Sequence, residues 1–457
     1  MERKISKELS AWKAKPDRKP LMVLGCRQIG KTYSIREFLR SNYDSYLEIN
    51  LEREPDKCLI FKDDLSAETI IDKLIMVSDK ELTPGRSAIF LDEIQSCKGA
   101  YSSLKWLAED RRFDIVVSGS FLGINLKGSG DRDASGRGEP ISPLGYVETI
   151  MMYPMDFEEY LWAAGVRQEV IDHAKDAIRN TERIDDAYNR MLTEHFRRYL
   201  VVGGMPEAVK VYTETKDYAK ARATIEDIIS VLRADVGKYS NRKTDRMKIL
   251  ACLESIPSQL ASDNRKFQYK DIEKSSGRAS MYGDALEWLV TAGMAYRCYN
   301  LRNIDPPLSM NLKEKAFKLY LCDNGLLMGL MDFADVGAIV TVDPFSNNGI
   351  VMENAVATAL AKKGYPLYYY AKDNSTLEID FVANTGKVEL IEVKSGRNKR
   401  SKSLNTLLAE KDRKRMGIKI CDGNVEVDDN GAIHLPLYGA CFLPEPEIPD
   451  ISFPDVN

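Results

Sequence analysis

The sequence predicts an α/β fold built around a parallel β-sheet, and three short apolar runs carry that prediction. These runs are residues 21–24, 87–91 and 113–117, and each is followed at once by glycine, acidic or serine residues. Segments with helical spacing, about 8 to 15 residues long, separate the runs. Such alternation is typical of a parallel sheet that binds its ligand at the carboxyl edge of the strands.

The first run continues into the pattern G-x-x-x-x-G-K-T, which predicts a phosphate-binding loop. Glycine is needed where the backbone approaches a polyphosphate or takes a positive φ, and backbone N–H groups meet the phosphate where the next helix begins. We expect Lys31 to reach the β- and γ-phosphates and the Thr32 hydroxyl to bind Mg²⁺. An ordinary glycine-rich turn is the alternative interpretation. The expected nucleotide-binding residues are Gly25, Cys26, Arg27, Gln28, Ile29, Gly30, Lys31 and Thr32.

The second run ends in Asp92-Glu93, the order of a Walker B motif. A carboxylate at the end of the strand can hold Mg²⁺, directly or through water. The next carboxylate projects one residue further and can orient or deprotonate the attacking water. The alternative is a strand that ends by chance in an acidic turn, which the phosphate loop upstream disfavours. We therefore expect Asp92 to bind the metal and Glu93 to be catalytic.

Composition and charge exclude several other classes of protein. The chain has 457 residues and a net charge of −4, so a nucleic-acid site would have to be a local basic patch. The eight cysteines form no C-x-x-C pair and the three histidines form no ligand pattern, which indicates reduced thiols and argues against a zinc site. Residues 1–19 contain no apolar signal-peptide core, and no apolar run approaches a membrane span. We expect a cytoplasmic protein that does not bind membranes.

The middle of the chain reads as mostly helical. Residues 156–255 contain one marked interruption, Gly203-Gly204-Met205-Pro206-Glu207. Residues 245–300 have the order of a winged helix, with three helices expected at 247–256, 269–274 and 280–292. The third of these carries Asp284 and Glu287 rather than a basic face, so we favour a structural or protein-docking role over DNA contact, without excluding DNA.

A second group of polar residues lies near the end of the chain. Asp380 lies within an expected strand at 377–383, and a tight turn leads to a strand at 388–394 with Glu392 and Lys394 on one face. Two carboxylates on adjacent strands can bind a divalent metal, and the lysine can polarise water or stabilise the transition state. Glu353, on an expected helix at 348–360, could complete the site. The alternative is a solvated sheet face on which glutamate and lysine simply pair.

The order helix, strand, strand, strand and the Asp…Glu-x-Lys spacing are the pattern of restriction-endonuclease-like nucleases. The basic run at 394–402 follows at once and offers a footprint for the phosphates of DNA or RNA. We expect this fold for the module, while nuclease activity remains an open question.

The chain resembles a large group of prokaryotic AAA-like P-loop ATPases that carry a winged-helix segment and a C-terminal restriction-endonuclease-like domain. The motifs that carry the resemblance are residues 17–32, 90–95, 118–120, 136–137, 153–160, 203–207, 378–382 and 391–396. The resemblance implies a core at 1–165, a helical lid at 166–244, a winged helix at 245–305, a nuclease-like domain at 306–445 and a tail at 446–457. It also implies ATP binding and hydrolysis with Mg²⁺.

The resemblance extends to two further residues that we expect to be catalytic. Ser118, with Ser120 as an alternative, occupies the place of a γ-phosphate sensor, although a serine-rich turn is the plainer interpretation. Arg137, with Arg132 as an alternative, lies in the glycine-rich run at 123–145 and could contact the phosphates.

Two functions are compatible with the sequence. The first is an ATPase that controls a nuclease-like domain acting on nucleic acid. The second is a nucleotide-dependent switch that docks a protein and cleaves nothing; oligomers are compatible with both.

Overall fold

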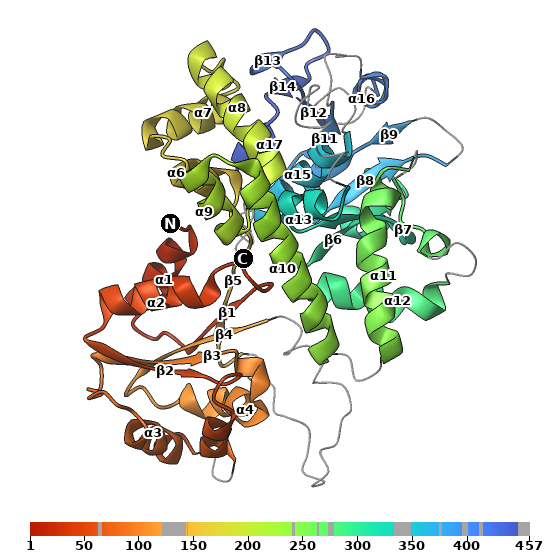
Figure 1. Cartoon of the computed structure of the whole chain (residues 1–457). Coiled ribbons are helices and arrows are strands. Elements are labelled where there is room, and N and C mark those ends of the chain that lie inside the picture. The colour runs from red at the N-terminus through yellow and green to blue at the C-terminus, as the bar shows by residue number, and fades with distance from the viewer. Residues whose placement is uncertain are drawn as a thin grey trace, which may run out of the picture. The chain divides into compact units, whose positions relative to one another are not determined.

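The computed structural model of the chain describes residues 1–62, 66–120, 143, 145–239, 243–262, 265–272, 278–332, 349–373, 377–394, 401–410 and 415–446 (Figure 1). The chain forms two compact units. The first comprises Met1–Tyr153 with the short pieces Asp235–Asn241 and Thr291–Gly293, and the second comprises the remainder. Within the described ranges, none of the helices combines the length and apolar character needed to cross a membrane.

The first unit contains a five-stranded sheet in the order β2-β3-β4-β1-β5, in which every pair of neighbours is parallel. This topology confirms the α/β prediction. The strands are β1 (Leu21–Leu24), β2 (Ser45–Asn50), β3 (Ser87–Asp92), β4 (Asp114–Gly119) and β5 (Glu148–Met151). Because all strands are parallel, their carboxyl ends lie at one edge of the sheet, where open α/β folds bind ligands.

Helices cover both faces of this sheet (Figure 1). They are α1 (Ile5–Ala14), α2 (Lys31–Asn42), α3 (Ala67–Met76) and α4 (Lys98–Leu107), with 3₁₀ turns η1 (Pro55–Phe61) and η2 (Ile94–Ser96). Alternate strand residues such as Ile49 and Leu91 share a core with Ile70 and Leu74 of α3. Two-sided burial explains why the inner strands β1, β3 and β4 read as continuous apolar runs, whereas the edge strand β2 alternates.

The second unit begins with a run of helices, as the sequence predicts. They are α6 (Phe157–Ala163), α7 (Gln168–Asn180), α8 (Asp186–Val202), α9 (Pro206–Thr215), α10 (Tyr218–Tyr239), α11 (Lys243–Leu260), η4 (Tyr269–Asp271) and α12 (Ala279–Thr291). The structure explains the motif at 153–160, which starts helix α6. Asp156 and Glu159 form a reciprocal capping box, in which each side chain accepts a hydrogen bond from the other residue's backbone N–H, and so start α6.

Two further sheets complete the second unit, in the orders β7-β6-β8-β9 and β10-β11-β12-β14-β13. Their strands are β6 (Ala295–Leu301), β7 (Leu312–Leu321), β8 (Tyr368–Ala371), β9 (Glu378–Ile379), β10 (Phe381–Asn384), β11 (Val388–Val393), β12 (Arg415–Ile420), β13 (Glu426–Val427) and β14 (Ile433–Leu435). The helices between and after them are η5 (Leu308–Asn311), α13 (Asn324–Gly329), α15 (Gly349–Lys362), α16 (Lys402–Leu408) and α17 (Gly439–Phe442).

The first of these sheets joins strands from both sides of the boundary expected near residue 305. Strand β6 pairs antiparallel with β7 and parallel with β8, where Tyr299 lies opposite Tyr368. The order α11, η4, α12 followed by the β6–β7 pair matches the expected winged-helix order, but β6 is not confined to that segment. The winged-helix identity and the domain boundaries remain predictions.

The strand expected at 377–383 is not continuous. Strand β9 ends at Ile379 and belongs to one sheet, whereas β10 begins at Phe381 and belongs to the other. Asp380 is the residue between them, and its carboxylate accepts the backbone N–H of Val393 at 2.8 Å. This side-chain hydrogen bond links the break between the two strands to the end of β11.

The glycine pair at 203–204 has a structural role in the second unit. Gly203 has a φ of 74°, and a Cβ on Gly204 would lie 2.0 Å from the carbonyl oxygen of Met155. The N–H of Gly204 donates to the buried carboxylate of Asp323 at 2.5 Å, and the N–H of Met155 donates to the Gly204 carbonyl at 2.7 Å. The same Asp323 carboxylate caps α13 through the N–H of Leu326 at 3.1 Å. Burial raises the pKa of Asp323.

We expect Gly204→Ala to destabilise the protein by roughly 1–3 kcal/mol, because the added methyl group cannot fit against the Met155 carbonyl without a backbone shift. Thermal unfolding followed by circular dichroism measures the change. Gly283→Ala is the matched control, because Gly283 lies in α12 with no atom within 4 Å of an added Cβ. The control should be neutral or slightly stabilising. Equal melting temperatures for the two variants would contradict the packing role of Gly204.

Candidate nucleotide-binding site

The loop between β1 and α2 opens into a cavity of about 640 Å³ in the first unit. This cavity brings the phosphate-loop residues and the acidic end of β3 together. Its lining residues are Arg27, Gln28, Gly30, Lys31, Thr32, Tyr33, Arg36, Asn50, Glu52, Arg53, Asp92 and Glu93. The lining is rich in charged groups of both signs, which suits a polyphosphate with a bound cation better than an apolar ligand.

Glycine is required at both fixed positions of the loop. A Cβ on Gly25 would lie 2.2 Å from the carbonyl oxygen of Met152, which follows the neighbouring strand β5. Gly30 has a φ of 86° immediately before α2 begins. Gln28 also has a positive φ, 65°, a conformation that non-glycine residues rarely adopt. The loop is therefore held in a conformation that few sequences tolerate.

Lys31 is folded over the loop that precedes it. Its ammonium group donates to the carbonyl oxygens of Gly25 at 3.0 Å and Cys26 at 2.7 Å, and the residue is only 6% exposed. Burial lowers the pKa of Lys31, and the nearby Glu93 carboxylate opposes that shift. A buried ammonium whose hydrogen bonds go to carbonyl oxygens is a good partner for a phosphate anion.

The carboxylate of Asp92 collects hydrogen bonds from three neighbouring segments. Thr32 Oγ1 donates to its two oxygens at 3.1 and 3.2 Å, Asn50 Nδ2 donates at 2.8 Å, and the Ser118 hydroxyl also donates. The parallel register explains this convergence, because Asn50 lies directly opposite Asp92 and Val117 lies opposite Leu91. Hydroxyl and carboxylate oxygens are the ligands that Mg²⁺ prefers, so the Thr32–Asp92 pair fits that ion.

Glu93 immediately follows β3 with a φ of 55°, which turns its side chain away from the strand direction. Its N–H donates to the Ser118 hydroxyl oxygen at 3.2 Å, and its carboxylate accepts from the Gln95 side chain. The N–H of Ser120 donates to the Gln95 Oε1 at 3.3 Å. Ser118 is fully buried and contacts both acidic residues. The two serines therefore support the acidic turn; a sensor role for Ser118 remains a prediction.

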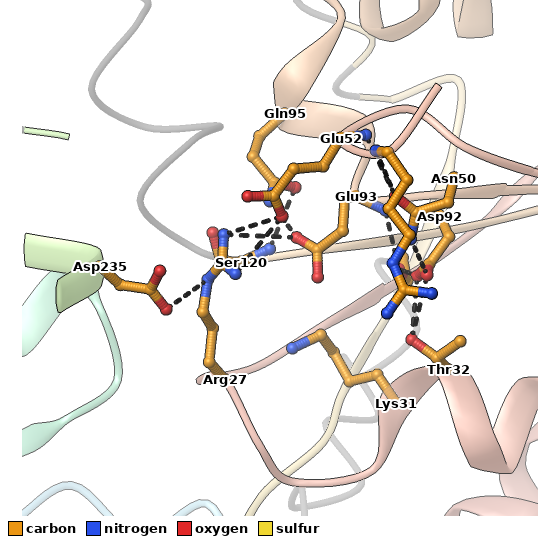
Figure 2. Close-up of polar contacts among 12 residues, drawn as sticks. Arg27, Lys31, Thr32, Asn50, Glu52, Asp92, Glu93, Gln95, Ser120 and Asp235 are labelled. Carbon is orange, nitrogen blue, oxygen red and sulfur yellow. Dashed lines mark hydrogen bonds and ion pairs between the residues drawn. The ribbon is translucent and has the colours of Figure 1, made fainter. Parts of the chain in front are cut away.

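Arg27 is surrounded by carboxylates in the same cavity (Figure 2). Its Nε lies 3.0 Å from an Asp235 oxygen, its terminal nitrogens lie 3.4 Å from Glu52, and Nη2 lies 3.9 Å from Glu93. Asp235 belongs to the short piece of α10 that is part of the first unit. Sequence reasoning missed Asp235, because nothing local marks it. It also missed Asn50, which a polar residue at the carboxyl end of β2 could have signalled.

Some of the expected site residues lie outside the described part of the chain. These are Arg132 and Arg137, and residues 395–400 of the basic run after Lys394. Their expected roles in phosphate contact remain predictions.

The second group of polar residues is partly assembled in the second unit. Strands β10 and β11 are antiparallel with Phe381 opposite Ile391, so Asp380 lies at the level of Glu392. The Lys394 ammonium lies 2.6 Å from Glu392 Oε1. Among the described residues, Glu392 Oε2 is buried and has no hydrogen-bond partner. Lys419, only 1% exposed, lies opposite Glu392 on β12 and was not predicted.

Glu353 is engaged elsewhere. Its carboxylate pairs with Arg265, accepts the Tyr320 hydroxyl at 3.0 Å, and lies 3.6 Å from the fully buried Lys318 ammonium. Lys318 also lies 2.8 Å from Glu378. No group of three or more histidine, cysteine or acidic residues in the described ranges is arranged to hold a metal ion. Completion of a metal site by Glu353 remains a prediction; in this structure its carboxylate faces two basic residues, Arg265 and Lys318.

Comparison with known protein families covers three parts of the chain. Residues 17–161 match a model described as an AAA domain. Residues 193–336 and 348–438 match two models described as domains of unknown function, DUF8612 and DUF4143. A search of curated protein sequences finds no match. Residues 17–161 thus match an AAA domain, and neither the winged helix nor the nuclease-like identity is part of these descriptions.

Solved structures resemble the chain only distantly. The Walker-type ATPase PABY2304 of Pyrococcus abyssi is 13% identical, with a TM-score of 0.39 over 72% of this chain and 95% of that one. The Aeropyrum pernix Orc1 protein, solved in complex with DNA, is 14% identical with a TM-score of 0.29 over 75% and 91%. A single-residue variant of Thermotoga maritima RuvB is 15% identical with a TM-score of 0.30 over 64% and 88%.

We expect Asn50→Ala to destabilise the protein by roughly 1–3 kcal/mol, because it leaves the buried Asp92 carboxylate short of one hydrogen bond. Chemical denaturation measures the loss. Asn42→Ala is the control: Asn42 is exposed at the end of α2 and donates only to the Phe38 carbonyl. The role assigned to Asn50 is wrong if both variants unfold at the same denaturant concentration.

Proposed function

We propose that the chain binds ATP in the 640 Å³ cavity and hydrolyses it with Mg²⁺. One observation carries this proposal: Lys31, Thr32, Asp92 and Glu93 line a single cavity at the end of a G-x-x-x-x-G-K-T loop. A glycine-rich turn of purely structural use would not need a buried ammonium and a hydrogen-bonded carboxylate at the same place. The match of this part of the chain to an AAA domain supports the same function.

In the proposed complex, the backbone N–H groups of residues 25–32 surround the phosphates at the start of α2. Lys31 leaves the carbonyls of its own loop for the β- and γ-phosphate oxygens, which relieves the unfavourable burial of its charge. Thr32 and Asp92 would hold Mg²⁺, which neutralises charge on the phosphate oxygens when it is bound. Asn50 and Ser118 keep the Asp92 carboxylate oriented for this task.

In the chemical step, a water oxygen forms a bond with the γ-phosphorus, and the bond from that phosphorus to the β–γ bridging oxygen breaks. Glu93 accepts the proton of the water, and ADP leaves with the bridging oxygen. We assign to Ser118 the positioning of both acidic residues, and to Arg137 the phosphate contact that the family resemblance implies. In this structure the Glu93 carboxylate accepts a hydrogen bond from Gln95. For the reaction, the Glu93 side chain has to turn from Gln95 toward the water.

We expect Lys31→Ala to abolish nucleotide binding, because it removes the buried cation that faces the phosphates. Glu93→Gln should retain binding but lower the turnover number by at least ~100-fold, since the amide cannot accept the proton. Binding is measured with a fluorescent ATP analogue and turnover by phosphate release. Undiminished ATP hydrolysis in both variants would refute the assigned site.

A second candidate function concerns the C-terminal module, and the contact between Lys394 and Glu392 favours it. We propose that nucleotide state controls a nuclease-like module that acts on nucleic acid. Asp380 precedes β10 at the level of Glu392 on β11, and Lys394 follows β11 and pairs with Glu392. Among the described residues, the buried Glu392 Oε2 has no hydrogen-bond partner, which is consistent with a site for a cation or a proton donor. Asp380 and Glu392 would hold a divalent cation through oxygen atoms.

The rival proposal is a nucleotide-dependent switch that docks a protein without cleavage. The pairing of Glu353 with Arg265 favours this rival, because it removes one carboxylate from a metal site. The acidic residues of α12 favour it as well, since Glu287 pairs with Arg297 rather than presenting a basic face.

Nicking of DNA or RNA with Mn²⁺ or Mg²⁺, with and without ATP, separates the two proposals. The nuclease-like proposal predicts cleavage that Asp380→Ala abolishes and binding that weakens steeply with salt. Asp373→Ala is the control, because Asp373 is an exposed partner of Lys313. Cleavage unaffected by Asp380→Ala would indicate a contaminant, and the absence of both cleavage and salt-dependent binding would leave the protein-docking switch.

A further inference from the structure

Arg27 occupies a variable position of the phosphate loop, yet it is the most heavily paired cation of the nucleotide cavity. Three carboxylates face its guanidinium: Asp235 at Nε, and Glu52 and Glu93 at the terminal nitrogens. The exposed fractions of these four side chains are 18% for Arg27, 8% for Asp235, 31% for Glu52 and 16% for Glu93. The group is thus largely shielded from water, where charge interactions are strong.

The carboxylates around Arg27 outnumber its single guanidinium, and Lys31 also interacts electrostatically with one of them, Glu93. One guanidinium, which cannot lose its proton, faces three carboxylates. An Asp235 oxygen lies 3.0 Å from Nε as an ion pair without hydrogen-bond geometry, whereas both terminal nitrogens donate to Glu52 at 3.4 Å and Nη2 lies 3.9 Å from Glu93. The terminal nitrogens are therefore the part of Arg27 that can bind a stronger anion in the cavity, while Asp235 stays next to Nε.

The position of Arg27 relative to Lys31 indicates which anion that is. Both side chains rise from the loop toward Glu93 (Figure 2). Lys31 is expected at the β- and γ-phosphates and Glu93 at the attacking water, so the space between Arg27 and Glu93 lies at the γ-phosphate end of a bound nucleotide. A diphosphate would not reach that end.

The other described arginines of the cavity are less suited to this contact. Arg36 is engaged with Glu48 through its Nε at 2.9 and 3.0 Å and its Nη2 at 2.5 Å. Arg53 is exposed at the margin of the cavity. Among these three arginines, Arg27 is half-buried and is the one that lies next to Glu93.

We propose that Arg27 is the residue that recognises the γ-phosphate, and that Asp235 is the positioning residue that holds it ready. The terminal nitrogens of Arg27 move from Glu52 and Glu93 to the γ-phosphate, which releases the Glu93 carboxylate for the attacking water. The site thereby distinguishes a nucleoside triphosphate from a diphosphate, and its base is freed only when the triphosphate is bound. This inference rests on the proposed ATPase function.

The test compares the affinities of the full chain for ADP and for a non-hydrolysable ATP analogue, AMP-PNP, by calorimetry with Mg²⁺. Arg27→Ala should weaken AMP-PNP binding ~10- to 100-fold and ADP binding less than ~3-fold, as expected for one charged hydrogen-bonded contact. Asp235→Asn should act in the same direction with a loss of ~3- to 10-fold. Free guanidinium ion should restore part of the AMP-PNP affinity of Arg27→Ala, which a role in folding alone would not allow.

Arg111→Ala serves as the matched control, because Arg111 is an exposed partner of Asp17. Circular dichroism verifies that each variant is folded, and Arg27→Lys replaces Arg27→Ala if the latter is not. Equal losses for the two nucleotides, or no loss, would overturn the inference while the proposed ATPase stands. A wild-type chain that binds neither nucleotide would overturn the proposed function and this inference with it.

Discussion

The buried carboxylate of Asp92 is the constraint around which the nucleotide cavity is organised. Taking such a group out of water costs several kcal/mol unless it is hydrogen-bonded. Here donors come from Thr32, Asn50 and Ser118, which lie on the start of α2 and the ends of β2 and β4. Satisfying this one charge therefore fixes the relative positions of three segments at the carboxyl edge of the sheet. The cavity is a consequence of that requirement as much as of the loop sequence.

The second unit depends on a comparable constraint. The Asp323 carboxylate is buried and accepts N–H groups from Gly204 and from the start of α13. Only glycine lets the turn after α8 approach this carboxylate and the Met155 carbonyl so closely. The glycine motif that the sequence shows as an interruption between helices is thus a tightly packed junction. In both units, a buried aspartate and close backbone contacts hold elements that are distant in the sequence.

The charged residues of the nucleotide cavity and those of the C-terminal module differ in whether their contacts leave a place for a ligand. In the nucleotide cavity, Lys31 is held by carbonyl dipoles that a phosphate can replace, and the terminal nitrogens of Arg27 make long contacts with Glu52 and Glu93. In the C-terminal module, Glu353 is already matched by Arg265 and Lys318. A phosphate can take over the contacts that Lys31 makes with carbonyl groups, whereas the Glu353 carboxylate already faces two basic side chains. This contrast is why the proposed ATPase has the stronger structural support.

Local signals were sufficient for the parallel sheet, the phosphate loop and the acidic strand end. Gly25, Lys31, Thr32, Asp92 and Glu93 could be placed from the sequence because each lies at a fixed distance from an apolar strand, and strand and loop geometry are local properties. The tertiary structure decided the partners of these residues: Asn50 beside Asp92, Asp235 beside Arg27, and the basic pair on Glu353. It also decided the break at Asp380. Such contacts join segments far apart in the chain, and their energy depends on burial and strand register that exist only once the chain has folded.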